Sequence, residues 1–188
     1  NKGLFVITML ATLFFTSCSE FNNIIKSGDY LYRYEAAKQY YADGKYTRAV
    51  VLLQDVISVL KGTDKGEESL YLLGISAYKA RDYEAAANFL KKYYETYTNG
   101  LYTQDARFYN AMALYKNTPE PKLDQTETYE AVTAFQNLLE IFPQSIYAKE
   151  SQDMIFKLQD KLVEKEYLSA KTYFDLGSYF GNCNFGGN

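Results

Sequence analysis

The side chains that could do chemistry in this sequence are few in kind. It contains two cysteines, Cys18 and Cys183, and twenty tyrosines, but no histidine. Without histidine there is no Ser-His or Cys-His pair, no histidine general base and no histidine metal ligand. The Asp and Glu residues show no paired spacing that indicates an acid/base couple or a metal cage, and no phosphate-binding Gly loop is present. The sequence therefore predicts a protein that is not an enzyme and needs no metal or other cofactor.

Cys18 follows a segment with the features of a targeting signal. Residues 4–15 form an apolar run behind Lys2, too short to cross a bilayer as a helix, and two small residues stand directly before the cysteine. This arrangement resembles the lipobox of bacterial lipoproteins, in which cleavage leaves the cysteine as the acylated first residue. We predict a signal peptide over residues 1–17, lipid attachment at Cys18 and a lipid-anchored linker over 18–29. An ordinary signal peptide and a buried helix with an incidental cysteine are the alternatives.

The bulk composition predicts one folded domain of ordinary size. Hydrophobic residues make up 47% of the 188 positions, so a disordered chain is not expected. The net charge of −3 argues against a nucleic-acid partner, which would need a basic surface. With Cys18 lipidated, no thiol is left to pair with Cys183, which is expected to be a free, structural cysteine.

Aromatic and small residues recur every 37 positions, the strongest pattern in the sequence. Each repeat predicts two amphipathic helices around a tight turn, at residues 32–42 and 47–60 in the first unit and at 70–79 and 84–97 in the second. In the third unit the second half arrives nine residues late, behind an insertion within residues 117–128. The positions in register include the small residues Ala37, Gly74 and Ala111 and the aromatic residues Tyr34, Tyr71, Phe108, Tyr41, Tyr78 and Tyr115.

A small residue, a tyrosine four positions later and a second tyrosine at the turn resemble the tetratricopeptide pattern. We expect an all-α fold, a tetratricopeptide-like right-handed superhelical solenoid of antiparallel helix hairpins over residues 30–188; an irregular helical bundle is the alternative. Residues 147–162 predict a long helix and 166–176 the first helix of a fourth repeat, so the domain is expected to hold three repeats and to be truncated within the fourth. Tyr167 and Phe174 would continue the aromatic series.

The aromatic residues at these positions form two series. The candidate groove residues are a first ladder of Tyr34, Tyr71 and Phe108 and a second ladder of Tyr41, Tyr78 and Tyr115. If the first helix of each unit lines the concave side, as in tetratricopeptide stacks, these rings would form a peptide-binding groove. For the first ladder, a place in the core between repeats is an equally open alternative, whereas for the second ladder exposure is favoured. Lys38, Lys79 and Lys116 follow the same helices and are expected to be solvated surface rather than a clasp for a carboxylate.

A family resemblance rests on motifs that generic repeat proteins lack. The discriminating motif is the Asp-Gln sequence inside the insertion of the third unit. The residues that carry the resemblance are Cys18, Asp124, Gln125, Thr126, Thr128, Ala131, Phe135, the run from Phe142 to Ala148, Leu162, Glu164, Glu166 and Ala170. They resemble the BamD family, lipoproteins of the bacterial β-barrel assembly machinery.

The resemblance implies a non-enzymatic scaffold that is lipid-anchored to the periplasmic face of the cell outer membrane. Its partners would be the barrel-forming subunit of the machinery and unfolded outer-membrane β-barrel proteins, whose folding and insertion it would assist; no nucleic acid is expected. The alternatives are a nutrient-binding, SusD-like lipoprotein or another envelope tetratricopeptide lipoprotein. SusD-like proteins are expected to carry tryptophan-rich sugar platforms, and this sequence has no tryptophan.

Overall fold

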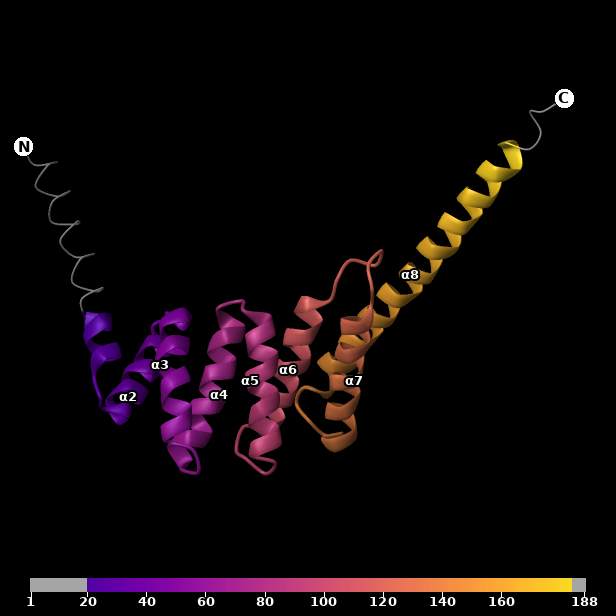
Figure 1. Cartoon of the computed structure of the whole chain (residues 1–188). Coiled ribbons are helices and arrows are strands. Elements are labelled where there is room, and N and C mark those ends of the chain that lie inside the picture. The colour runs from indigo at the N-terminus through magenta and orange to yellow at the C-terminus, as the bar shows by residue number, and fades with distance from the viewer. Residues whose placement is uncertain (1–19, 184–188) are drawn as a thin grey trace, which may run out of the picture. The chain divides into compact units, whose positions relative to one another are not determined.

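The computed structural model describes the backbone of residues 20–183 and is helical throughout this range apart from turns (Figure 1). A short helical segment at residues 20–26 comes first. The helices that follow are α2 (Tyr30–Ala42), α3 (Tyr46–Val59), α4 (Asp64–Lys79), α5 (Tyr83–Thr96), α6 (Thr103–Asn117), α7 (Thr126–Ile141) and α8 (Ala148–Cys183). None of the helices in the described range has the length and hydropathy needed to cross a bilayer. The predicted signal peptide, Cys18 and the side chain of Cys183 lie outside the described part of the chain.

The chain divides into two compact units, Asn1–Arg81 and Asp82–Asn188. In the first unit, α3 packs against both α2 and α4. Asp29 caps the N-terminus of α2: its carboxylate accepts hydrogen bonds from the backbone N–H groups of Leu31 and Tyr32 at 2.9 and 3.0 Å. One apolar face of α3, with the spacing of an amphipathic helix, is buried at Ala49, Leu52, Leu53 and Val56.

The second unit is a run of helices packed in chain order, α5 on α6, α6 on α7 and α7 on α8. One part of its core lies among α6, α7 and the first half of α8. The buried members of that core are Phe108, Ala111, Ala131, Phe135, Leu138, Ile155 and Leu158. The two units together bear out the prediction of an all-helical chain.

The end of the chain differs from its expected division into two helices. A single helix of 36 residues, α8, runs through both predicted segments and extends away from the other helices of its unit (Figure 1). Residues 163–166 contain neither Gly nor Pro, and Glu and Lys are good helix formers, so nothing interrupts the helix there. Tyr167 and Phe174, expected to continue the aromatic series, are 64% and 75% exposed on this helix.

Candidate binding surfaces

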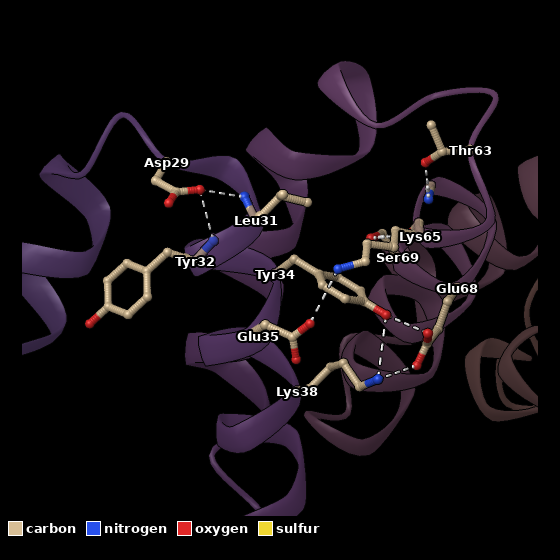
Figure 2. A network of polar contacts seen from close by, with 11 residues as sticks. Asp29, Leu31, Tyr32, Tyr34, Glu35, Lys38, Thr63, Lys65, Glu68 and Ser69 are labelled. Carbon is tan, nitrogen blue, oxygen red and sulfur yellow. Dashed lines mark hydrogen bonds and ion pairs between the residues drawn. The ribbon is translucent and has the colours of Figure 1, made fainter.

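Tyr34 of the first ladder is the centre of a polar network within the first unit (Figure 2). Only 2% of the residue is exposed, and its hydroxyl donates a hydrogen bond to the carboxylate of Glu68 on α4. Lys38, one turn further along α2, places Nζ 2.9 Å from Glu68 Oε1 and 3.4 Å from the Tyr34 hydroxyl oxygen. The ammonium groups of Lys38 and Lys65 also lie 5.2 and 5.3 Å from the centroid of the Tyr34 ring. Three charged side chains therefore surround one buried tyrosine.

The electrostatics of this network favour its paired state at neutral pH. Burial, together with the hydrogen bond to Glu68, raises the pKa of the Tyr34 hydroxyl to about 12. The hydrogen bond to Glu68 is the main cause that raises the pKa of Lys38. Burial acts to raise the pKa of Glu68, but the hydrogen bonds from Tyr34 and Lys38 outweigh it and hold this pKa below its ordinary value. A neutral hydroxyl, an ammonium and a carboxylate thus hold α2 and α4 together.

The first ladder lies mainly in the core. Tyr34 is buried against α4 as described, and Phe108, with 3% exposed, stacks on Tyr147 with ring centroids 4.1 Å apart and planes 8° apart. Tyr71 is half-buried. For Tyr34 and Phe108, exposure in a binding groove was therefore the wrong alternative. The faces of α2 and α6 that carry these two residues each turn toward neighbouring helices of the same unit.

The Tyr34 network leads to a stability prediction. Tyr34→Phe removes the hydroxyl that bonds Glu68 but keeps the buried ring, and it is expected to lower the free energy of unfolding by about 1 kcal/mol at pH 7, a low figure because Lys38 and Glu68 are partly exposed. The lowered pKa of Glu68 means that its stabilising contribution is present above its unfolded pKa and is lost as pH falls through the lower, folded value. The difference between variant and wild type should therefore shrink at an acidic pH below the ordinary pKa of a glutamate.

Urea unfolding followed by circular dichroism, at both pH values, measures this difference. Tyr32→Phe is the matched control, because it removes the same hydroxyl from an exposed ring on the same helix. Equal unfolding midpoints for the two variants at pH 7 would show that the Tyr34 hydroxyl contributes no stability.

The second ladder is more accessible than the first. Tyr41, Tyr78 and Tyr115 are all half-buried. Tyr41 packs edge to face on Tyr46 with ring centroids 5.6 Å apart, and the Lys116 ammonium lies 5.6 Å from the Tyr115 ring centroid. Peptide binding by these tyrosines stays a prediction, and each lies in a setting that leaves part of its ring reachable from solvent.

The insertion of the third unit has an ordered internal structure. Gln125 is buried, and its Nε2 donates to the carbonyl oxygens of Glu120 and Leu123 at 2.8 and 3.1 Å. Its Oε1 accepts from the Thr128 hydroxyl at 2.7 Å, and Asp124 accepts from the Thr126 backbone N–H at 2.9 Å. The Asp-Gln-Thr motif therefore folds the loop and starts α7.

Two lysines of α8 bind the same loop. Lys161 Nζ donates to the Thr118 hydroxyl at 2.7 Å and to the Pro119 carbonyl oxygen at 3.1 Å. Lys165 Nζ donates to the Lys122 carbonyl oxygen at 3.0 Å. The insertion thus braces the long helix, a role that the sequence analysis did not assign to these lysines. The spacing of four residues between Lys161 and Lys165 places both side chains on one face of α8, and it could have indicated this shared role.

The structure also has a groove between α5 and α7 that was not predicted from the sequence. Both helices pack on α6, which contributes Asn110, Leu114 and Asn117 to the floor between them. Two adjoining cavities of about 550 and 490 Å³ share Ala87, Asn88, Leu114 and Glu130, so they are two parts of one groove. The lining residues are Glu84, Ala87, Asn88, Lys91 and Tyr94 of α5, Asn110, Leu114 and Asn117 of α6, and Thr126, Glu127, Tyr129, Glu130, Thr133, Ala134 and Asn137 of α7.

The sequence matches a known protein family over most of its length. Residues 29–184 match the protein family described as YfiO, an outer membrane lipoprotein. A protein of Aquifex aeolicus (strain VF5), provisionally named outer membrane protein assembly factor BamD, is 26% identical over 171 residues. That alignment covers 90% of this chain and 56% of the relative, so the chain spans little more than half of the relative's length.

The solved structures give an independent likeness of fold. A crystal structure of tetratricopeptide-like repeats from a kinesin light chain homologue of Podospora anserina superposes with a TM-score of 0.51 at 16% identity. The match covers 77% of this chain and 76% of that one. At this level of identity the likeness concerns the fold alone, and it agrees with the helix hairpins predicted from the 37-residue period.

Proposed function

Since the chain belongs to the YfiO family of outer membrane lipoproteins, to which BamD belongs, we propose that it is a lipid-anchored scaffold of the β-barrel assembly machinery. In this role it binds the barrel-forming subunit and unfolded outer-membrane proteins and assists their folding and insertion. Cys18 carries the lipid, and the protein faces the periplasm. The observation that carries the proposal is the family match over residues 29–184, which includes the insertion of the third unit.

The described structure supports a scaffold in two ways. The two cavities between α5 and α7 form an open groove on the surface of the helices. The insertion that carries the family motif is held by buried Gln125 and by Lys161, which gives the motif a structural purpose within the second unit. A helical-repeat framework with open grooves suits the binding of other polypeptides.

Co-purification from detergent-solubilised outer membranes tests the proposal. The affinity-tagged full-length protein is expected to bring down the barrel-forming subunit, identified by mass spectrometry, in near-stoichiometric amount. If this subunit is missing while the tagged protein is folded and membrane-bound, the assembly role is wrong and another envelope lipoprotein role takes its place. Cys18→Ala is the control for anchoring: it should lose acylation and still capture the detergent-solubilised subunit, because acylation attaches the protein to the membrane and not to its partner.

A further inference from the structure

The groove between α5 and α7 has a fixed, polar floor. Asn110 of α6 is only 4% exposed, and its Nδ2 donates to the Ala87 carbonyl oxygen at 2.8 Å. The Tyr94 hydroxyl lies 3.4 Å from Asn110 Oδ1, and the Arg107 guanidinium lies over the Tyr94 ring at 4.2 Å from its centroid. These contacts link α5 to α6 at the base of the groove. A ligand would therefore meet a preformed surface and would not have to order it.

Small residues and amides shape the walls. Ala87 on α5 and Ala134 on α7 leave space above the floor. Asn88, Asn117 and Asn137 line the groove from three different helices. A side-chain amide both donates and accepts hydrogen bonds, which matches the N–H and C=O groups that an extended peptide presents along its backbone.

The charges in the groove are unevenly placed. Glu84, Glu127 and Glu130 line the cavity of about 490 Å³, with no basic residue in its lining. Among the residues that the structure describes, none of these three glutamates takes part in an ion pair. Lys91 lines only the other cavity. Three exposed carboxylates beside amide groups are complementary to a single cationic side chain at one end of a bound segment.

We propose that this groove binds an extended polypeptide segment of a partner protein and that a Lys or Arg of the segment lies among Glu84, Glu127 and Glu130. The amides of Asn88, Asn117 and Asn137 pair with the backbone of the segment, and the carboxylates select its basic residue. The proposal deepens the proposed function and rests on it for the protein nature of the partner. It assigns a binding surface on α5, α6 and α7, apart from the two tyrosine ladders.

Fluorescence anisotropy with defined peptides tests this site on the full chain. The probe is a labelled peptide of about eight Ser, Thr and Ala residues with one central Arg, which spans roughly 26–29 Å when extended. A second peptide carries Gln in place of Arg. The Arg peptide is expected to bind more tightly than the Gln peptide. The double variant Glu127→Gln, Glu130→Gln should bind the Arg peptide roughly fivefold or more weakly. Its affinity for the Gln peptide should be nearly unchanged.

The matched control removes the same charge from outside the groove. Glu120→Gln combined with Glu140→Gln changes two exposed glutamates that do not line either cavity, and it should alter affinity by less than about twofold. An equal loss of affinity for the Arg peptide in both double variants would mean that it binds by general charge attraction. Equal affinities for the Arg and Gln peptides would mean that the groove does not select a basic residue. Either result overturns the proposal. Capture of the barrel-forming subunit is scored separately, so a failure of the assembly role and a failure of the groove are distinguishable.

Discussion

Gly66→Ala is expected to destabilise the first unit by about 3 kcal/mol or more, enough to unfold a marginal helical domain. Gly66 lies in the first turn of α4, where the chain returns from the end of α3. A Cβ atom built at this position would lie 2.0 Å from the carbonyl oxygen of Leu60 and 2.7 Å from its carbonyl carbon. Both are backbone atoms, so no side-chain rotation can relieve the contact and the α3–α4 connection would have to move.

The connection has little freedom to move. The Thr63 hydroxyl caps α4 by accepting from the Gly66 N–H at 3.1 Å, and it also donates to the Leu60 carbonyl oxygen at 2.7 Å. Displacement of Leu60 by the new methyl group therefore breaks the cap as well as the packing. Thermal and urea unfolding of the variant, followed by circular dichroism, measure the loss.

Gly28→Ala is the control for this experiment. Nothing lies within 4 Å of a Cβ built at Gly28, so the same substitution there is expected to change stability by no more than about 0.5 kcal/mol. Similar midpoints for Gly66→Ala and Gly28→Ala would show that the close approach to Leu60 is not a constraint on the fold.

The helices of the first two repeats could be predicted closely, and Gly66 explains the largest departure. Residues 32–42, 47–60 and 84–97 agree within two residues with α2, α3 and α5. The helix expected at 70–79 begins six residues earlier, at Asp64. The glycines of residues 61–66 predict a loop, but Gly66 is helical and is needed for its small size, not for turn geometry. Sequence spacing cannot distinguish these two uses of glycine.

The surfaces were harder to predict because they depend on helix rotation and on distant partners. Tyr34 and Tyr41 share a helix and a period, yet only Tyr34 is buried, through a partner, Glu68, that lies 34 residues away. The groove on α5, α6 and α7 needs three helices to form. Its wall residues do repeat every three or four positions, but most are polar, and a polar stripe on a helix ordinarily predicts only a solvated face.

The nine-residue insertion determines the register of α7, that is, which of its residues face the core. Substitution of Phe135 tests this register. Phe135→Ala is expected to lower the free energy of unfolding by about 3–5 kcal/mol, because the ring is fully buried and its removal leaves a cavity among Phe108, Leu138 and Leu158. Its ring centroid lies 6.4 Å from that of Phe108 with planes 63° apart, so an aromatic contact is lost as well.

Phe156→Ala is the matched control, since Phe156 lies on α8 in the same unit with its side chain exposed, and the change there should be within about 0.5 kcal/mol. Urea unfolding measures both variants. If α7 were out of this register, Phe135 would face solvent and the two variants would behave alike. The result also bears on the groove, because α7 carries Phe135 on its buried face and Glu130 and Asn137 among the groove residues. A register that buries Phe135 is the one that turns these groups toward α5, so confirmed burial of Phe135 supports the placement of Glu130 and Asn137 in the groove.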